Sequence, residues 1–239
     1  MHKNVEKMSF CYSPNFDMPK RRPANIKYII LHYTGMVNDF AAIKKLCNTK
    51  SKVSCHYYVK KNGEIINLVP DLYTSWHAGV SFWKKDKFLN SKSIGIEISN
   101  AGHDHRYTNF PKTQVKSLIQ LINKLKKKFN IKNKNILGHS DIAPFRKKDP
   151  GEKFPWEFLS KHKIGFWHKL SQTNCKKLRN KKYKNKDLFF KQLFNFGYMK
   201  TKIPKEKNKL VKAFQRRFRP SLINGIVDRE CFEILKSLL

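Results

Sequence analysis

The loop over residues 138–151 combines residue types that could catalyse a metal-assisted hydrolysis. His139, Lys147 and Asp149 lie within eleven residues of one another, and the prolines and glycines of this stretch predict a loop without regular structure. A neutral imidazole and a carboxylate are suitable ligands for a divalent metal, and a nearby ammonium can stabilise an oxyanion. His32, which ends an apolar run elsewhere in the chain, supplies a second imidazole. Together these residues predict a hydrolytic zinc site.

Hydrolytic zinc centres commonly use three protein ligands and leave a fourth position for water, whose pKa then falls towards about 7. We expect the ligands to be His32, His139 and Asp149. His32 ends a predicted strand, which can hold it rigidly, and the other two flank the proline-rich loop.

The general base of such a site should lie on a neighbouring strand and point into the same pocket. In residues 93–99, isoleucines alternate with glycine, glutamate and serine at a period of two, which is typical of a strand. Glu97 is the acid in this apolar segment and is therefore the candidate base. The alternative is a structural Glu97 paired with one of the many lysines, and the spacing alone does not choose between the two.

Other polar residues near these motifs are candidates for further roles. Lys147 could face the oxyanion as a cation, although Arg146, Lys147 and Lys148 could equally form a solvated basic turn. We expect His77, on a predicted loop, and Arg146 to contact substrate, whereas His56 is interpreted as a packed histidine behind the ligands. The remaining histidines are interpreted as surface residues, among them His103, His105, His162 and His168.

The elements that must position these side chains alternate between short β-rich runs and amphipathic segments. Asn62-Gly63 predicts a hairpin with a type I′ turn, and Asn38 could cap a helix through residues 41–46. Apolar residues at helical spacing over residues 115–129 predict a second helix with lysines on its other face. Strands are expected at residues 28–32, 55–60, 64–69, 93–99 and 135–138. We therefore predict an α/β fold with a mixed central sheet flanked by helices, plus a small C-terminal all-α module.

The composition allows a packed core but is unusually basic. Hydrophobic residues make up 40% of the 239 residues, and the formal net charge is +34. Such a charge implies a polyanionic neighbour, either nucleic acid, an anionic membrane face or an acidic envelope polymer. An AT-rich coding genome would explain the abundance of Lys, Asn, Ile and Phe equally well. The five cysteines are scattered without a Cys-x-x-Cys pair, which predicts neither a disulfide framework nor a thiolate zinc site.

The composition changes after about residue 165. The last 74 residues carry 20 Lys and Arg against 5 Asp and Glu, and they contain short amphipathic segments at residues 188–196, 210–218 and 229–238. We expect an N-terminal lead-in over residues 1–23, a main domain over 24–165, a basic linker over 166–186 and a helical domain over 187–239.

No apolar run approaches the length of a transmembrane segment, and the first residues lack the apolar stretch of a cleavable secretory signal. The missing signal and the scattered cysteines favour the cytoplasm as an expectation.

Five short motifs follow one another along residues 24–160. They are Leu31-His32-Tyr33-Thr34, Ser54-Cys55-His56-Tyr57, Trp76-His77-Ala78-Gly79, Ile94-Gly95-Ile96-Glu97, and His139 to Pro144 continued by Arg146 to Gly151. In this order they resemble the zinc-dependent N-acetylmuramoyl-L-alanine amidases of the AmpD and AmiD type. That family shares its fold with phage lysozyme-like amidases and animal peptidoglycan recognition proteins.

The resemblance implies a role for each matching residue. The family's zinc ligands fall on His32, His139 and Asp149, its catalytic carboxylate on Glu97 and its catalytic lysine on Lys147. It also implies substrate contacts near the Trp-His-Ala-Gly motif and makes the main domain the amidase catalytic domain.

A second resemblance covers the C-terminal region. Residues 211–220, which include Ala-Phe-Gln-Arg-Arg-Phe, and residues 225–228 resemble a peptidoglycan-binding helical domain, which follows the amidase domain in AmiD-type enzymes. The alternative is a helical cap for the catalytic domain. A wall-binding module favours the periplasm, cell envelope or secretion over the cytoplasm.

The activity implied is zinc-dependent hydrolysis of the amide between N-acetylmuramic acid, or its 1,6-anhydro form, and L-alanine, in cell-wall turnover, remodelling or recycling. Peptidoglycan and muropeptides would be the partners. One rival is a non-catalytic peptidoglycan recognition protein. A nucleic-acid binder driven by charge is a second rival, but charge leaves the ordered motifs unexplained, so no nucleic acid is expected.

Overall fold

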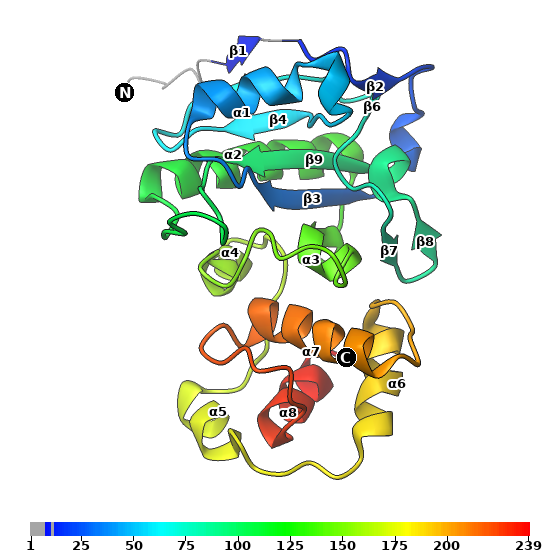
Figure 1. Cartoon of the computed structure of the whole chain (residues 1–239), viewed down its shortest axis with the longest axis vertical. Coiled ribbons are helices and arrows are strands. Elements are labelled where there is room, and N and C mark those ends of the chain that lie inside the picture. The colour runs from blue at the N-terminus through cyan, green and yellow to red at the C-terminus, as the bar shows by residue number, and fades with distance from the viewer. Residues whose placement is uncertain (1–7, 11) are drawn as a thin grey trace.

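The computed structural model describes residues 8–10 and 12–239, so that residues 1–7 and Cys11 of the predicted lead-in lie outside the described residues. Six strands of this described part form one mixed sheet in the order β1-β5-β4-β9-β3-β10. Helices flank the sheet, and a helical unit lies below it in the view of Figure 1. The predicted mixed sheet flanked by helices is confirmed.

The centre of the sheet carries two of the predicted site residues. Strand β9 (Ser93–Ile98) lies between β3 (Tyr28–Tyr33) and β4 (Tyr57–Val59) and runs parallel to both. Its register pairs Glu97 with His32 of β3. Paired residues of neighbouring strands point to the same face of a sheet, so the two side chains share one face. The isoleucines of β9 alternate with them and point to the other face.

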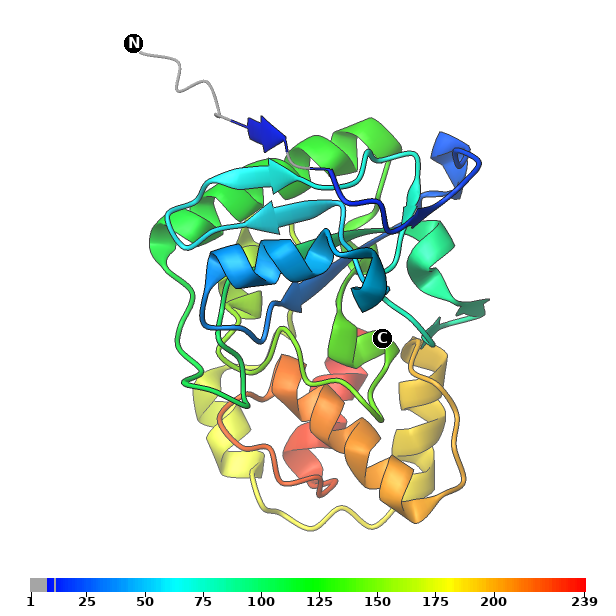
Figure 2. The ribbon, with the colours of Figure 1, turned by 45° about the horizontal axis from the view of Figure 1, so that its top comes forward.

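Two helices cover opposite faces of the sheet (Figure 2). Helix α2 (Lys112–Phe129) packs its apolar stripe on one face and ends at Asn130, whose left-handed conformation closes the helix. Helix α1 (Asp39–Leu46) packs on the other face. Its predicted cap is confirmed, since the Asn38 side chain accepts a hydrogen bond from the Ala41 amide at 3.1 Å.

Strand β5 (Ile65–Asn67) pairs antiparallel with β4, which confirms the hairpin. The predicted type I′ turn is wrong, because it needs a positive φ at both central residues and Asn62 has none. Gly63, at φ +90°, instead ends a three-residue loop that is closed by a hydrogen bond from the Lys60 amide to the Glu64 carbonyl at 2.9 Å. A residue without Cβ adopts this conformation at no steric cost.

Strand β10 (Ile136–Gly138) pairs with β3 and leads directly into the short helix α3 (His139–Ile142). The prediction of a loop without regular structure is therefore wrong for its first residues. The Asp141 carboxylate accepts a hydrogen bond from the Gly138 amide at 2.8 Å, which caps this turn. Helix α4 (Trp156–Lys161) follows the loop.

Short elements complete this part of the chain. Strand β1 extends the sheet beside β5, β2 pairs with β6, and β7 pairs with β8. Part of the predicted lead-in is thus built into the edge of the sheet. The bounds of these strands are Met8–Phe10 (β1), Phe16–Asp17 (β2), Thr74–Ser75 (β6), Phe82–Trp83 (β7) and Asp86–Lys87 (β8), and 3-10 turns occupy Pro23–Asn25, Thr49–Ser51, Leu89–Lys92 and Asn133–Asn135.

The C-terminal part is helical. Helices α6, α7 and α8 confirm the three predicted amphipathic segments. Helix α5 lies inside residues 166–186, where the sequence predicts a linker, and Cys175 and Tyr183 of that segment are buried in the same core as the later helices. This segment therefore packs as part of the helical unit, with its lysines outside, and the domain boundaries stay a prediction. The bounds are Gln172–Leu178 (α5), Lys186–Phe196 (α6), Pro204–Phe218 (α7) and Arg229–Leu238 (α8).

One buried hydrophobic cluster joins part of the sheet to the helical unit. Ile30 of β3 and Leu137 of β10 belong to the same buried cluster as Phe214 and Phe218 of α7. Helix α7 accordingly lies directly below α3 and α4 in Figure 1. Within the described residues, no helix combines the length and the hydropathy needed to cross a bilayer.

Candidate functional site

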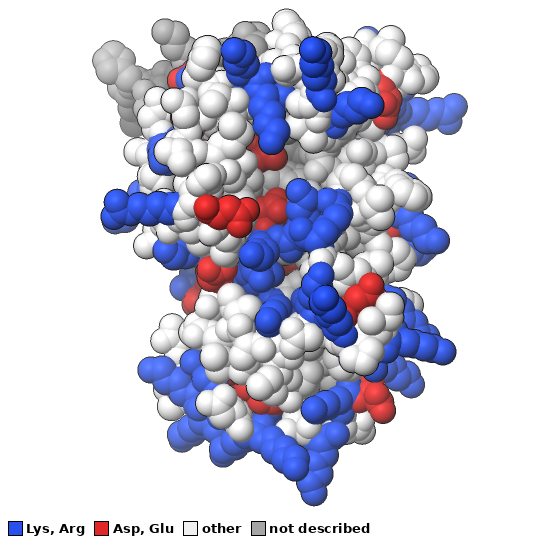
Figure 3. All heavy atoms as spheres, viewed as in Figure 1, with Lys and Arg blue, Asp and Glu red and all other residues white. Residues whose placement is uncertain are grey.

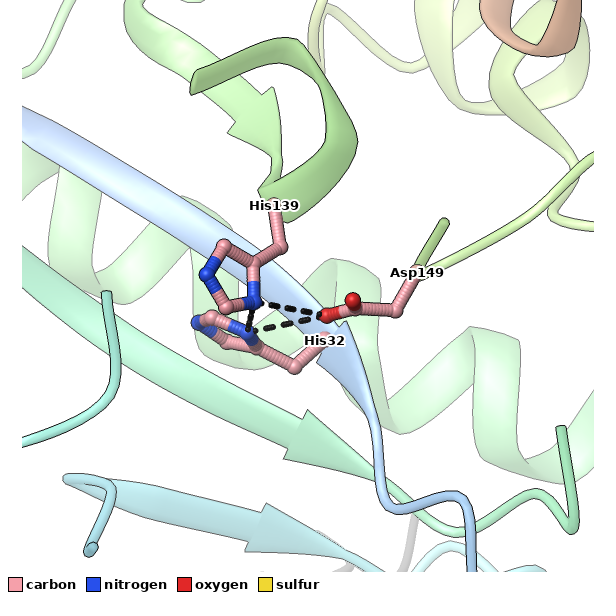
Figure 4. A group of neighbouring side chains, drawn as sticks. All are labelled: His32, His139 and Asp149. Carbon is pink, nitrogen blue, oxygen red and sulfur yellow. Dashed lines mark hydrogen bonds and ion pairs between the residues drawn. The ribbon is translucent and has the colours of Figure 1, made fainter. Parts of the chain in front are cut away.

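Three side chains from separate elements converge on one point (Figure 4). His32 lies near the end of β3, His139 begins α3 and Asp149 follows the loop, and all three are buried. The Nδ1 atoms of His32 and His139 lie 2.9 Å apart. The Asp149 Oδ2 lies 3.1 Å from the His32 Nδ1 and 3.0 Å from the His139 Nδ1. The three residues expected as ligands thus form a group that could hold a metal ion.

The donor set fits a zinc ion in number, type and spacing. Tetrahedral zinc lies about 2.0–2.1 Å from its ligands, which places the ligands roughly 3.3 Å from each other. The separations in this cluster, from 2.9 to 3.1 Å, approach that value. The His139 Nε2 lies 3.1 Å from the Ala78 carbonyl oxygen, which can only accept a hydrogen bond. Nε2 therefore carries the proton, and the lone pair of Nδ1 faces the cluster.

A chain of hydrogen bonds fixes the other imidazole in the same way. Ser93 donates its hydroxyl proton to the Leu89 carbonyl at 2.6 Å, so its Oγ accepts from the His77 Nε2, 3.1 Å away. The His77 Nδ1 is then an acceptor, and the His32 Nε2 donates to it at 3.0 Å. The lone pair of the His32 Nδ1 is left to face the cluster, as a metal ligand requires.

Gly95 makes room for this chain. A Cβ atom at this position would lie 2.3 Å from Cγ of the His77 ring, well inside van der Waals contact. Strand β9 therefore needs glycine here, so that the His77 ring can pack against the strand and reach the His32 Nε2.

The electrostatics of the cluster favour the metal-binding forms of His32 and Asp149. Burial, and then the neighbouring His139, lower the pKa of His32 to about 4, so its imidazole is neutral near pH 7. Burial alone would raise the pKa of Asp149, but the imidazoles of His139 and His32 together hold it well below its usual range. Asp149 is accordingly an ionised carboxylate.

Glu97 is next to this cluster, on the strand beside His32. Burial, and then the charge of Asp149, raise the pKa of Glu97 well above its usual value, while the ammonium of Lys147 acts in the opposite direction. The Glu97 Oε2 is buried and has no hydrogen-bond partner among the residues that the structure describes. A carboxyl group in this state is suited to exchange a proton with a molecule in the cavity.

The residues expected from the sequence meet in one cavity of about 510 Å³. This volume falls in the range of small-molecule sites. The expected site residues that line it are His32, His77, Glu97, His139, Arg146, Lys147 and Asp149.

Arg146 is mostly engaged with the protein itself. Its guanidinium donates to the carbonyls of Ala78 and Val80, the latter at 2.8 Å. It thereby ties the Trp-His-Ala-Gly loop to the metal-site loop. Because both ring nitrogens of His77 also have protein partners, substrate contacts by Arg146 and His77 stay predictions.

Two other histidines have structural partners. His56 is buried and accepts a hydrogen bond from the Gly95 amide at 3.0 Å, which confirms it as a packed residue. The prediction that His103 is a surface residue is wrong. It is half-buried between the Tyr33 hydroxyl, 2.8 Å from its Nδ1, and the Glu152 carboxylate, 2.9 Å from its Nε2.

Ser93 and Asp141 support the site but were not predicted from the sequence. Ser93 begins an apolar strand, where serine is unremarkable, so its part in the histidine chain has no signal in the sequence. Asp141 lies in the fifth motif, two residues after His139, and that proximity is the signal that could have marked it.

Comparison with known proteins agrees with this geometry. A family model described as N-acetylmuramoyl-L-alanine amidase matches residues 21–152. This range contains all the cavity-lining residues named above. The curated N-acetylmuramoyl-L-alanine amidase AmiD of Escherichia coli is 35% identical over 231 residues, which cover 90% of this chain and 82% of AmiD.

Two solved structures resemble the whole chain. The complex of Escherichia coli AmiD with its substrate anhydro-N-acetylmuramic acid-L-Ala-D-gamma-Glu-L-Lys has a TM-score of 0.80 at 33% identity and covers 90% of this chain and 89% of that one. AmpDh3 from Pseudomonas aeruginosa also has a TM-score of 0.80, at 30% identity, and covers 94% of this chain and 95% of that one.

Proposed function

The chain belongs to the N-acetylmuramoyl-L-alanine amidase family, and on that basis we propose how its cavity hydrolyses peptidoglycan fragments. The bond cleaved is the amide between N-acetylmuramic acid, or its 1,6-anhydro form, and the L-alanine of the stem peptide. The process served is cell-wall turnover, remodelling or recycling. The observation that carries the proposal is the convergence of His32, His139 and Asp149 in one cavity with Glu97.

The metal of this cluster is zinc in our proposal. Two neutral imidazoles and one carboxylate form a donor set typical of hydrolytic zinc sites. A zinc ion held by His32, His139 and Asp149 would lower the pKa of a water molecule and polarise the amide carbonyl.

Two other residues act on the reacting groups. Glu97 accepts the proton of the attacking water and returns a proton to the leaving amino group of L-alanine, because its carboxyl has an oxygen without a protein partner. The ammonium of Lys147, which lines the same cavity, stabilises the negative charge that develops on the carbonyl oxygen. Arg146 and His77 contact the substrate at the wall of the cavity.

The helical unit is proposed to contribute to peptidoglycan binding, as its resemblance to a peptidoglycan-binding domain implies. A Glu97→Gln chain, which should bind substrate without consuming it, can be sedimented with purified sacculi. Binding that persists when an excess of soluble muropeptide occupies the cavity supports the proposal, and loss of sedimentation under that condition contradicts it.

A product assay tests the activity. The purified chain is incubated with an anhydro-muropeptide and with intact sacculi, with and without a chelator, and the products are identified by mass. We expect release of the stem peptide with its L-alanine amino group free, loss of this release in chelator and recovery on addition of zinc. Full activity in a metal-free preparation would overturn the metal-dependent mechanism.

The same assay separates the enzyme from a non-catalytic recognition protein. A receptor would bind the muropeptide and leave its mass unchanged. Glu97 and the complete cluster argue for the enzyme. A buried carboxyl oxygen without a protein partner is costly to keep, and proton transfer in catalysis explains it where binding alone does not.

A further inference from the structure

Helix α7 carries the Ala-Phe-Gln-Arg-Arg-Phe sequence that resembles a peptidoglycan-binding module. Its two adjacent arginines are not displayed on the surface. The side chain of Arg217 is 3% exposed and that of Arg216 is 11% exposed, and both form ion pairs with carboxylates of the other part of the chain.

Arg217 reaches the turn that begins with His139. Its guanidinium pairs with the Asp141 carboxylate, donates to the Ile136 carbonyl at 3.1 Å and lies 3.9 Å from the centre of the Trp156 ring. Tyr198, also from the helical unit, donates its hydroxyl proton to the other oxygen of Asp141 at 2.7 Å.

Asp141 links these contacts to the metal site through the backbone next to His139. The oxygen that meets Arg217 also accepts the Gly138 amide at 2.8 Å and so fixes the backbone on which His139 begins α3. The Ser140 amide in turn donates to the Asp149 carbonyl at 2.8 Å. These hydrogen bonds therefore fix the backbone at His139 relative to the backbone at Asp149.

Arg216 supports the far end of the same loop. It pairs with Glu152 at 3.8 Å, and Glu152 also binds His103, which binds the Tyr33 hydroxyl. Lys209, two turns earlier on α7, donates to the Phe145 carbonyl in the middle of the loop at 2.8 Å. One face of α7 thus contacts the loop at its start, middle and end.

We propose that helix α7 supports the catalytic site, with Arg217 and Arg216 as positioning residues that hold His139 and Asp149 in place for the metal. This inference rests on the metal site of the proposed function. It gives the helical unit a second role, independent of any binding to the cell wall, since the two arginines contact Asp141 and Glu152 of the catalytic part.

The test measures zinc affinity of the full chain by competition with a chromophoric chelator. Arg217→Leu should weaken zinc binding about 10–100-fold, the range seen when a residue that orients a metal ligand is lost. Arg219→Leu is the matched control. Arg219 lies just after the same helix and is 1% exposed, but it pairs with Asp228 and Glu230 inside the helical unit. The control should lose stability and keep wild-type zinc affinity.

Two conservative variants keep the test decisive if Arg217→Leu does not fold. Tyr198→Phe removes one hydrogen bond to Asp141, and Arg217→Lys keeps the charge without the planar fork. Both should weaken zinc binding, change the visible spectrum of the cobalt-substituted chain and speed amide hydrogen exchange at Gly138 and Ser140 in the metal-free chain.

The outcomes separate this inference from the function on which it rests. Wild-type zinc affinity in the Arg217 and Tyr198 variants, or an equal loss in Arg219→Leu, would overturn the positioning role alone. A wild-type chain that binds no zinc would overturn the proposed metal site and this inference with it.

Discussion

At the scale of single residues, Glu97 is the group on which proton transfer depends. Its Oε2 is buried without a hydrogen-bond partner among the described residues, which is costly unless a bound molecule supplies one. Replacing Glu97 by Gln keeps the shape and removes the base, so we expect kcat to fall about 10²–10⁴-fold. Zinc content, measured by elemental analysis, should stay at the wild-type level. A Glu97→Gln enzyme that releases stem peptide at the normal rate would contradict the role.

Lys147 should lower the pKa of the Glu97 carboxyl as well as stabilise the oxyanion. Its positive charge opposes the burial and the Asp149 charge that raise the pKa of Glu97. The base must be ionised to accept a proton, so activity falls as the pH drops through this pKa. Lys147→Met removes the favourable charge, raises the pKa of Glu97 further and should move the acid limb of the kcat/KM profile to higher pH. Lys132→Met, at an exposed lysine that does not line the cavity, is the control and should leave the limb in place, whereas equal limbs in all three chains would refute the coupling.

His77 has two possible roles, which one pair of variants can separate. If it orients His32, His77→Ala should weaken zinc binding about 10–100-fold, because the acceptor for the His32 Nε2 proton is lost. His77→Gln, whose amide oxygen can accept that proton, should recover part of the affinity. If His77 only touches substrate, both variants will raise KM and bind zinc as the wild type does.

At the scale of elements, strand β9 uses its two faces differently. Ile96 packs against helix α2, while Gly95 leaves space for the His77 ring. Gly95→Ala places a methyl group where the ring lies, and such overpacking costs about 1–3 kcal/mol. We expect both Tm and zinc affinity to fall.

Ile96→Val gives the matched control on the opposite face of the same strand. It should cost about 0.5–1.5 kcal/mol and leave zinc affinity unchanged. If Gly95→Ala lowers Tm without any change in zinc affinity, the link from the strand through His77 to the metal site is wrong.

The elements of the catalytic part could be predicted where one local signal dominated. Period-two alternation located β9, helical spacing located α2, and a side-chain cap located the start of α1. Spacing alone gave Glu97 only as one of two alternatives, since a structural ion pair with lysine fits the same pattern. The register that pairs it with His32 is a tertiary property.

The errors arose where distant groups decide local structure. Prolines and glycines predict an irregular loop after His139, yet the Asp141 carboxylate caps a helical turn there while bound to Arg217 from far along the chain. The division that makes residues 166–186 a linker stays a prediction, but their lysine-rich composition gave no sign of helix α5 or of the buried side chains that pack it against the later helices. Neither contact has a sequence-local signal.

At the scale of the whole molecule, one buried hydrophobic cluster joins the two parts of the chain, which meet through α7. On the face that Figure 3 shows, Lys and Arg side chains lie over both parts. A formal net charge of +34 creates a positive field around the molecule. Muropeptide stems carry free carboxylates, so this field should attract the proposed substrate.

Salt should weaken that attraction in a way that kinetics can detect. The screening length shrinks from above 10 Å to below about 8 Å as salt rises from about 0.05 M to about 0.5 M. We expect kcat/KM for an acidic muropeptide to fall roughly 10-fold or more over this range, with a smaller change in kcat, because encounter depends on the long-range field and chemistry does not. A muropeptide whose stem carboxylates are amidated is the control and should lose most of this dependence. Equal salt dependence for the two substrates would mean that the positive surface serves some purpose other than substrate capture.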